Sequence, residues 1–572
     1  MSTILTTIIL ILVFLKITRD SLFYLWLWQV KEYRIDRMKS YLKENSNVGS
    51  IVPLGLWSSG AKYKTSQNAN AKRLHINTPQ TPLKRGIATM EPAAVYFIGL
   101  VLILISYFNQ SVFAYLVLIF FIFTFYQIIK EIKKRALKRP RFTFKVILIF
   151  FLEAIFYFSF FAFYWIPASA GMTNSLILFL LFFYLITPIL IAVIILFTNP
   201  FFNFQKKRII KRASLKMRNL KKIRVIGITG SYGKTSTKEF LYTILNQKYK
   251  VVKTEGNNNT NIGVAYTVLN KVNDDYDYFI CEMGAYKIGE IKEMCKIVEP
   301  EIGILTGINE QHLELFGSME NTIKAKFELI ESLPENGLAI INSSIKYQVL
   351  SIKLENIKHF SLDSVSDIRV YQDCVKFIYK NQKFKADFLG KHYIENLLAA
   401  IITAKKLGMN LKEISEAVKK IKPSKFMMRK LWGPDNSVFI DDSYSANPDG
   451  VIVALDYLDE AYKDYQKIIV FSGIIELGKS SEGVHKKLFD RIGEVCDMAY
   501  ILNQDTKSLY SPARPASGHK GIMEPANKCE FVFEKDFDKM VNMLRNNLEK
   551  NTVVLFESRG AGVVMKKLKN IK

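Results

Sequence analysis

Long apolar runs separated by short basic stretches dominate the first two hundred residues. The runs are Ile4–Ile17, Leu22–Trp28, Ala93–Phe108, Val112–Ile129, Val146–Ile166 and Ser175–Phe197. The last two are long enough to cross a hydrocarbon layer of roughly 30 Å, whereas Ala93–Phe108 and Val112–Ile129 are short and could form a hairpin. This pattern predicts a membrane domain over residues 1–200 with about five transmembrane helices.

Basic residues follow two of these runs, at Lys130–Arg141 and Lys206–Lys222. Because Lys and Arg concentrate on the cytoplasmic side of a membrane, both stretches should face the cytoplasm. Residues 201–222 are then a basic juxtamembrane linker, and we expect a multi-pass protein of the cell membrane with its C-terminal half in the cytoplasm. The N-terminal run has no basic region before it and no small-residue cleavage site after it, which favours a retained anchor over a signal peptide.

The pattern changes at Ile223, where short apolar runs of β type begin to alternate with stretches of helical spacing. The β-type runs are Tyr278–Cys281, Ile302–Thr306, Leu338–Asn342, Val438–Ile440, Ile468–Phe471 and Val553–Phe556. Such alternation predicts α/β domains built on parallel sheets. A polar break at Lys420–Ser424 divides this half into domains at 223–422 and 423–572.

A glycine-rich turn connects the first β-type run of this half to a helical segment. The turn and the start of the helix contain Gly230, Ser231, Gly233, Lys234, Thr235 and Ser236. Backbone N–H groups of such a loop hold phosphate oxygens, the lysine reaches the β- and γ-phosphates, and a hydroxyl ligates Mg²⁺. ATP and Mg²⁺ are therefore the expected cofactors. Ile228 stands where the full Walker pattern has its first glycine, so the loop has the shorter Gly-x-x-Gly-Lys-Thr form.

The net charge of this 572-residue chain is +27, and hydrophobic residues make up 49% of it. In a soluble protein such a charge would suggest a nucleic-acid partner. Much of the charge flanks the apolar runs, however, and this favours membrane lipids over nucleic acid. The five cysteines include no Cys-x-x-Cys pair and fit reduced thiols in the cytosol.

Four further stretches connect the glycine-rich loop to a known family. They are Thr254–Val264, Glu282–Ala285, Asn309–Leu313 with Phe316–Leu329 after it, and Asp441–Pro448. In this order they resemble the Mur ligase family, and within it the MurF branch, over roughly Ile223 to Lys567. The resemblance implies a P-loop central domain, a Rossmann-like C-terminal domain, and ATP-dependent formation of an amide bond on a peptidoglycan precursor.

The resemblance also assigns roles to individual positions of the central domain. Lys234 matches the phosphate-binding lysine, and Thr235 matches a hydroxyl that ligates Mg²⁺. Glu282 and His312 match further Mg²⁺ ligands, although imidazole is an unusual ligand for so hard a metal. Lys326 matches a carbamylated lysine, in which added CO₂ converts the cation into an anion that can lie at the metals.

Other positions match the nucleotide side of the family's site. Asn396 matches an asparagine beside the adenine, and Arg429 and Asp442 match residues of the last domain that contact ATP when that domain closes. The stretch Glu476–Gly478 with His485 matches a further MurF signature whose role the residues do not reveal. Lys234, Lys326 and Arg429 form the expected catalytic set.

Three departures from the family concern the acceptor and the last domain. The family's soluble N-terminal domain, which holds a uridine-diphosphate sugar, is replaced by the apolar runs. Ser445 stands at an expected asparagine, and a Lys-Gly-Ser-Arg-like element reads Phe556–Gly560, in which Glu557 reverses a charge.

The chemistry requires such a set of groups. Transfer of the γ-phosphoryl group of ATP to a carboxylate gives an acyl phosphate, which an amine then attacks. Because carboxylate and triphosphate repel each other, Mg²⁺, Lys234 and Arg429 must supply positive charge between them. The expected substrates are a muramyl peptide, either small and soluble or lipid-linked, and an amino acid or dipeptide. No residue of the sequence identifies the base that deprotonates the amine.

Two other functions remain open from the sequence. A poly-amino-acid ligase of the folylpolyglutamate type shares the ATP chemistry, although Asn257–Gly263 and Asp441–Pro448 favour the MurF branch. An ATP-driven transporter or sensor would need polar residues within its spans. Glu153 is the clearest such residue, and a structural anchor is therefore favoured for the membrane half.

Overall fold

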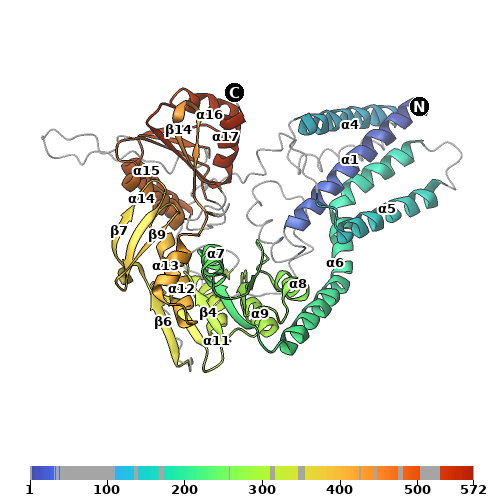
Figure 1. The fold of residues 1–572 in the computed structure, drawn as a ribbon. Coiled ribbons are helices and arrows are strands. Elements are labelled where there is room, and N and C mark those ends of the chain that lie inside the picture. The colour runs from blue at the N-terminus through green and yellow to red at the C-terminus, as the bar shows by residue number, and fades with distance from the viewer. Residues whose placement is uncertain are drawn as a thin grey trace, which may run out of the picture. The chain divides into compact units, whose positions relative to one another are not determined.

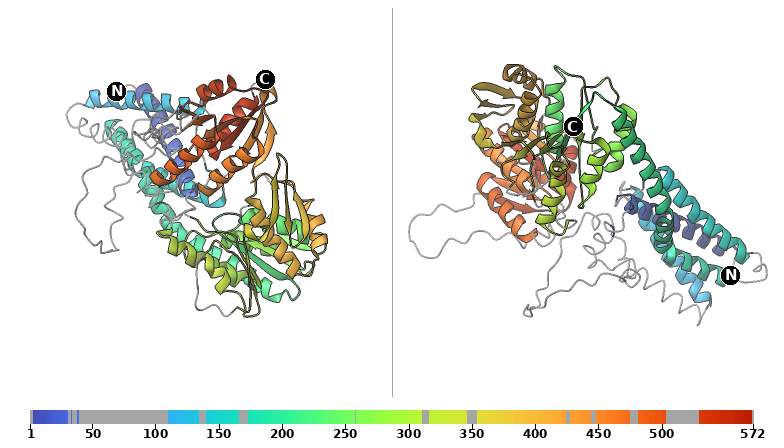
Figure 2. Two further views of the ribbon diagram at one scale, coloured as in Figure 1. Left: turned by 90° about the vertical axis from the view of Figure 1, so that its left-hand side faces the viewer. Right: turned by 90° about the horizontal axis from the view of Figure 1, so that it is seen from below.

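The computed structural model describes residues 3–30, 33, 38, 110–133, 140–165, 173–256, 258–309, 316–345, 354–423, 427–443, 448–474, 481–502 and 529–570. The chain forms two compact units, Met1–Gln205 and Lys206–Lys572. Figure 1 shows the first as helices only and the second as sheets covered by helices, and Figure 2 gives two further views.

The first unit is built from long helices. They are α1 Thr3–Val30, α4 Gln110–Lys133, α5 Phe144–Trp165 and α6 Thr173–Asn219, whose end belongs to the second unit. Five of the six apolar runs are therefore helical: Ile4–Ile17 and Leu22–Trp28 in α1, Val112–Ile129 in α4, Val146–Ile166 in α5 as far as Trp165, and Ser175–Phe197 in α6. The sixth, Ala93–Phe108, lies outside the described residues. Within the described ranges, one helical stretch, Phe182–Asn219, is long and apolar enough to cross a membrane. The five-span topology stays a prediction.

A polar network joins three helices of this unit. The Ser21 hydroxyl of α1 donates a hydrogen bond of 2.5 Å to the buried Glu153 carboxylate of α5. One turn further along α5, Tyr157 is hydrogen-bonded to Thr187 of α6, with 2.9 Å between the hydroxyl oxygens. These bonds connect neighbouring helices, which is a structural use of Glu153.

The central domain of the second unit contains a parallel sheet. Its elements are β1 Arg224–Thr229, α7 Lys234–Leu245, β2 Val251–Lys253, α8 Asn261–Lys271, β3 Tyr278–Glu282, α9 Glu290–Val298, β4 Ile302–Leu305, α11 Met319–Glu331, β5 Leu338–Asn342 and β6 Asn356–Phe360. The strand order is β2-β3-β1-β4-β5-β6. Ile226 and Ile228 of β1 pack with α7 on one face of the sheet. Val225 lies on the opposite face, which packs with α8, α9 and α11. Both faces are thus buried, as in other doubly covered parallel sheets.

A small antiparallel sheet and two helices follow. They are β7 Ser366–Val370, β8 Val375–Tyr379, β9 Gln382–Ala386, α12 Tyr393–Lys406 and α13 Leu411–Val418. Sequence analysis did not predict this sheet. Its first strand is largely exposed, so it lacks the apolar pattern that marks the other strands.

The C-terminal domain has a second sheet, of order β10-β11-β15-β12-β13-β14, in which β10 alone of the described strands is antiparallel to its neighbour. Its elements are β10 Arg429–Trp432, β11 Val438–Asp442, α14 Pro448–Ala461, β12 Gln466–Phe471, α15 Ser481–Val495, β13 Met498–Ile501, β14 Glu530–Phe533, α16 Phe537–Arg545, β15 Thr552–Glu557 and α17 Ser558–Asn570. Val553 and Leu555 of β15 pack with α14 and α15, and Val554 and Phe556 pack with α16 and α17.

The predicted linker at 201–222 is mostly helical, because α6 continues to Asn219. Ala213 and Met217 of this helix are buried in the hydrophobic cluster that contains α8 and α9. The Lys216 ammonium donates hydrogen bonds of 3.0 Å to two carbonyl oxygens near the C-terminal end of α8. The end of α6 is therefore part of the core of the central domain.

Candidate active site

The glycine-rich loop connects β1 to α7 at the carboxyl edge of the central sheet. Gly230 and Gly233 have φ values of +151° and +78°. A Cβ atom on Gly233 would lie 2.2 Å from Asn396 Oδ1 of α12. Both the left-handed backbone and this close approach require glycine at position 233. The turn therefore has the tight, backbone-lined form predicted for a phosphate-binding loop.

Lys234 is half-buried at the first turn of α7. Its Nζ donates hydrogen bonds to the carbonyl oxygens of Gly230, at 2.6 Å, and Ser231, at 2.9 Å. Burial lowers the pKa of Lys234, and the nearby charge of Glu282 opposes this shift. The ammonium group thus lies directly over the loop, where the sequence predicted it.

Glu282 ends β3 next to this loop and is only 2% exposed. Its carboxylate accepts hydrogen bonds from Thr235 Oγ1 at 3.1 Å, Asn259 Nδ2 at 3.0 Å and Lys238 Nζ at 2.9 Å. Lys238 is completely buried and also donates to the carbonyl oxygen of Gly256, at 3.1 Å. A buried charge without a partner is strongly unfavourable, and Lys238 and Glu282 each provide that partner for the other.

Sequence analysis missed Lys238. The signal was its position four residues after Lys234, which puts both side chains on one face of α7.

The donor atoms around Glu282 are suited to Mg²⁺. This ion prefers oxygen ligands and is commonly bound by one or two carboxylates, with phosphates and waters completing the shell. The Thr235 hydroxyl and the Glu282 carboxylate are in direct contact and offer such oxygens. No group of three or more His, Cys, Asp or Glu residues that could hold a metal occurs in the described part of the chain. His312, the other predicted ligand, lies outside the described residues.

Lys326 lies buried on α11, and its Nζ donates a hydrogen bond of 3.4 Å to the carbonyl oxygen of Ala285. Burial lowers the pKa of Lys326 to about 7, and the positive charge of Lys234 acts in the same direction, against Glu290 and Glu328. A substantial fraction of this amine is therefore neutral near pH 7. The neutral form is the one that reacts with CO₂.

Asn396 is buried near the start of α12, on the side of α7 that carries the loop. Besides its approach to Gly233, its Oδ1 accepts a hydrogen bond of 3.4 Å from Thr237 Oγ1. Its position beside the nucleotide loop fits a role in binding ATP. The specific contact with adenine stays a prediction.

Arg429 and Asp441 face each other across β10 and β11. Arg429 Nη2 lies 2.6 Å from Asp441 Oδ2. Burial would raise the pKa of Asp441, but hydrogen bonds from Ser443 and Arg429 outweigh burial and lower it. Arg429 thus remains a positive group at this edge, with its side chain 40% exposed. Its predicted contact with ATP is untested.

Asp442 and Glu557 are cross-strand neighbours at the ends of β11 and β15. Burial raises the pKa of Glu557 well above its ordinary value, and the charge of Asp442 adds to the shift. Burial and the charge of Asp441 raise the pKa of Asp442 to about 7. Ser558, directly after Glu557, has a φ of +76°. The sequence shows Glu557 only as a reversal of charge relative to the family pattern. Its place opposite Asp442 follows from the register of β11 and β15, which the sequence does not show.

Comparisons with known proteins agree with this geometry. The Mur ligase middle domain family matches residues 228–404, and the Mur ligase, glutamate ligase domain family matches residues 428–560. The UDP-N-acetylmuramoyl-tripeptide--D-alanyl-D-alanine ligase of Rickettsia prowazekii is 30% identical over 384 residues, which are 64% of this chain and 81% of that protein.

The chain belongs to the Mur ligase family.

Two further relatives extend this result. The ligase of the same name from Escherichia coli is 32% identical over 292 residues, 49% of this chain and 63% of that protein. The structure of MurF from Thermotoga maritima in complex with ADP has a TM-score of 0.54 at 25% identity, over 64% of this chain and 83% of that one. This Mur ligase is an ATP-dependent, ADP-forming enzyme of the MurF type, and neither matching family model includes residues 1–227.

His485 of this Mur ligase has a structural environment. It is buried on α15, where its Nε2 accepts a hydrogen bond of 3.2 Å from the Ile474 backbone N–H. Its Nδ1 lies 2.7 Å from the carbonyl oxygen of Ser481. Burial lowers the pKa of His485, so the neutral ring holds the backbone that follows β12. The adjoining stretch Glu476–Gly478 lies outside the described residues.

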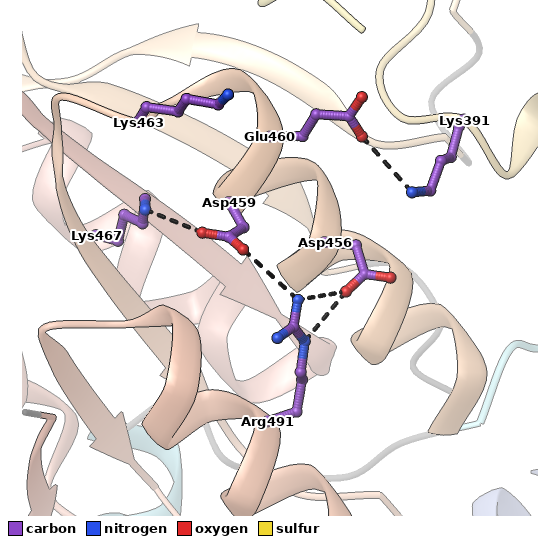
Figure 3. Close-up of a pocket in the computed structure, with 7 residues that line it drawn as sticks. All are labelled: Lys391, Asp456, Asp459, Glu460, Lys463, Lys467 and Arg491. Atoms are coloured by element: carbon purple, nitrogen blue, oxygen red, sulfur yellow. Dashed lines mark hydrogen bonds and ion pairs between the residues drawn. The ribbon is translucent and has the colours of Figure 1, made fainter. Parts of the chain in front are cut away.

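A charged pocket of this Mur ligase lies elsewhere, on α14 and α15 (Figure 3). It is lined by Lys391, Asp456, Asp459, Glu460, Lys463, Lys467 and Arg491. Arg491 pairs with Asp456 at 2.7 Å, and Lys467 pairs with Asp459 at 3.3 Å. These opposite charges largely neutralise one another, and no predicted site residue lines the pocket.

Proposed function

We propose that this Mur ligase joins D-alanyl-D-alanine to a UDP-N-acetylmuramoyl tripeptide or a lipid-linked form of it, with conversion of ATP to ADP and phosphate. The names of the relatives from Rickettsia prowazekii and Escherichia coli state these two substrates for those proteins. The observation that carries the proposal is the group of charges at the end of β3. There the Thr235 hydroxyl and the Lys238 ammonium are hydrogen-bonded to the Glu282 carboxylate, and the Lys234 ammonium lies nearby over the carbonyl oxygens of the phosphate loop.

In this mechanism the phosphate loop orients the triphosphate through its backbone N–H groups. The Lys234 ammonium balances the charge that develops on the transferred phosphoryl group. Thr235 and Glu282 would hold Mg²⁺, which supplies further positive charge between ATP and the acceptor carboxylate. Arg429 would add a cation from the C-terminal domain. Each of these groups lowers the repulsion that opposes formation of the acyl phosphate.

Lys326 is proposed to carry the carbamate that the family resemblance implies. Its buried amine has a pKa of about 7, so a neutral nucleophile is available for CO₂ without a separate base. A carbamate at this place would offer oxygen atoms on the side of Lys234 and the metal. The positive charge of Lys234 repels a protonated Lys326. The same positive charge would attract a negatively charged carbamate at this position.

We also propose that the N-terminal unit attaches the ligase to the cell membrane, with the catalytic unit in the cytoplasm. Large hydrophobic side chains are unusually exposed in this unit, with Phe14, Phe158 and Phe197 at 69%, 73% and 86%. Such a surface is suited to lipid. Attachment would bring the enzyme close to lipid-linked acceptors, and this is the reason to include them in the proposal.

The test is ADP release by the purified full-length chain with Mg-ATP. Muramyl tripeptide and D-alanyl-D-alanine are added separately and then together, and the amide is sought by mass spectrometry. The proposal predicts release that requires both substrates. ADP release at the same rate without either one would contradict it and favour an ATP-driven transporter. A lipid-linked tripeptide, compared with the soluble one, tests which acceptor is used.

A further inference from the structure

Lys238 of α7 has no exposed surface, which is unusual for a lysine. Its ammonium lies 2.9 Å from Glu282 Oε2 and donates a second hydrogen bond, of 3.1 Å, to the carbonyl oxygen of Gly256. A carboxylate oxygen of Glu239 is 3.8 Å away, but that carboxylate is paired with Lys253. Glu282 is therefore the acid that balances the buried charge of Lys238.

The chain supplies hydrogen-bond donors to both oxygen atoms of the Glu282 carboxylate. Oε1 accepts a bond of 3.0 Å from Asn259 Nδ2, and Oε2 accepts the bond from Lys238. The Thr235 hydroxyl lies within 3.2 Å of both oxygens. A buried carboxylate that lacked such partners would need a cation from solution to offset its burial. Glu282 has its partners within the chain, so its burial does not require a metal ion.

The charges beside Glu282 oppose the binding of a free divalent cation. Lys234 and Lys238 lie about one turn apart on the same face of α7, so two ammonium groups accompany one buried carboxylate. Like charges repel strongly where little water screens them. Mg²⁺ would meet this repulsion if Glu282 and Thr235 were its only partners.

A triphosphate in the glycine-rich loop reverses this balance. Its several negative charges exceed the positive charge of Lys234 and Lys238, and its oxygens are ligands that Mg²⁺ prefers. Protein sites for Mg²⁺ commonly combine one or two carboxylates with the phosphates of a substrate. The charges of this site therefore suit a metal that arrives together with ATP.

We propose that Lys238 is the fixed counter-ion of Glu282 and thereby makes the binding of Mg²⁺ at this site dependent on ATP. The inference rests on the proposed ATP-dependent function and deepens it, because it assigns an order to the binding of metal and nucleotide. Lys238 is a positioning residue: one hydrogen bond holds the Glu282 carboxylate, and the other holds the segment at Gly256. Without this cation, Glu282 and Thr235 would form a site for Mg²⁺ alone.

The test measures metal binding directly and does not depend on turnover. Mn²⁺ takes the same oxygen ligands as Mg²⁺ and is paramagnetic. It is titrated into the purified full-length chain without nucleotide, and free Mn²⁺ is followed by electron paramagnetic resonance. Lys238→Met should bind Mn²⁺ about 10-fold more tightly than the wild type, because one opposing charge is gone. Lys238→Gln, which keeps a hydrogen-bond donor, should show the same gain.

Three control variants define the cause of this gain. Lys238→Arg keeps the charge and should bind Mn²⁺ as the wild type does. Lys419→Met removes one member of an exposed ion pair at the end of α13 and should have no effect. The double variant Lys238→Met/Glu282→Gln should lose the gain, which would locate the added binding at Glu282.

Thermal unfolding provides a second readout, because a ligand that binds only the folded chain raises the thermal midpoint. Mg²⁺ alone should raise the midpoint of Lys238→Met and leave that of the wild type unchanged. For the wild type, Mg²⁺ should raise the midpoint only when a non-hydrolysable ATP analogue is present. A purely structural role of Lys238 would lower the midpoint of its variants equally with and without Mg²⁺.

Two results would overturn the inference. One is tight binding of Mn²⁺ by the nucleotide-free wild type that Glu282→Gln abolishes. The other is an Mn²⁺ affinity of Lys238→Met and Lys238→Gln equal to that of the wild type. The first measurement needs no variant of Lys238, so it decides the question even where Lys238→Met does not fold. Absence of amide product with the wild-type chain would instead count against the proposed function and would leave the metal measurements unaffected.

Discussion

A buried glutamate ends one strand in each of the two six-stranded sheets, and the two glutamates are neutralised differently. Glu282 of the central sheet lies against the buried ammonium of Lys238, with 2.9 Å between nitrogen and oxygen. Glu557 of the C-terminal sheet lies against another carboxyl, that of Asp442. The first glutamate is paired with a fixed cation, which suits a metal and triphosphate site. A shared proton neutralises the second, and a proton can be exchanged during a reaction.

We expect the largest difference between the two glutamates when the Lys238 cation is removed. Lys238→Met leaves Glu282 buried and unpaired, which should cost about 3–5 kcal/mol of unfolding free energy. Glu557→Gln replaces a group that is already protonated and should change stability by less than about 1 kcal/mol. Thermal and denaturant unfolding of the catalytic unit within the full chain measure both. The double variant Lys238→Met/Glu282→Gln should recover much of the loss; equal losses in Lys238→Met and Glu557→Gln would refute the distinction.

The catalytic side of the comparison depends on Lys234. Lys234→Ala should reduce ADP formation roughly 100- to 1,000-fold, the effect of losing one positioned electrostatic donor. Among the described residues, the Lys234 ammonium is hydrogen-bonded to the loop carbonyls alone, so stability should change little. ADP release with both substrates provides the measurement, and Lys463→Ala, in the charged pocket of Figure 3, is the control. Wild-type turnover in Lys234→Ala would exclude the loop as the phosphate site.

Lys326 differs from Lys238, the other buried lysine of the central domain. Among the described residues, Lys326 has no buried acid as a direct partner. Lys326→Ala should lower amide formation roughly 100-fold if the carbamate positions a catalytic charge. Carbamylation should increase as the pH rises through about 7, since the neutral amine is then more abundant. NMR with isotope-labelled bicarbonate should detect a carbamate signal in the wild type and not in Lys326→Ala. The same signal in both proteins would remove the assignment.

The pH dependence of stability tests the role of the carboxyl pair in the C-terminal sheet. A carboxyl whose folded pKa is raised contributes stability that is present below its unfolded pKa and is lost as the pH rises through the folded value. For Asp442 that window extends from 3.8 to about 7. Wild-type stability should therefore fall relative to Asp442→Asn by on the order of 2 kcal/mol across it. Denaturant unfolding at several pH values measures this difference. Parallel curves for the two proteins would contradict a shared proton.

The smallest effect concerns the helix that precedes both sheets. Lys216→Met removes the hydrogen bonds from α6 to the carbonyl oxygens of Val268 and Leu269. We expect a loss of about 1 kcal/mol, because the bonds come from a charged group at the end of a helix. Arg212→Met, whose side chain is exposed, is the matched control. The thermal midpoint of the catalytic unit reports the change, and no difference between the two would mean that α6 is not held there.

Much of this fold could be predicted from the pattern of the sequence. Leu338–Asn342 is the strand β5 as predicted, and the other five apolar runs of this half also form strands. The order of motifs located Lys234, Glu282 and Lys326, which the fold brings to one edge of the central sheet. These groups are close because parallel strands end at the same edge.

Other features depend on tertiary contacts that no local pattern records. Lys238 resembles a solvent-exposed helix lysine until β3 covers it. Ala213 and Met217 lie among basic residues, and only packing against α8 and α9 shows that this stretch is not a free linker. The partnership of Asp442 with Glu557 joins residues far apart in the chain through strand register. Sequence can therefore predict the elements and motifs, while the pairing of buried charges requires the fold.

The most direct test of the central claim follows an oxygen atom. Muramyl tripeptide labelled with a heavy oxygen isotope in its acceptor carboxylate is turned over by the full chain with ATP and D-alanyl-D-alanine. Activation through an acyl phosphate predicts that each released phosphate carries one labelled oxygen and that one amide forms for each ADP. Unlabelled phosphate, released whether or not the tripeptide is present, would contradict the ligase mechanism and leave ATP hydrolysis for another purpose.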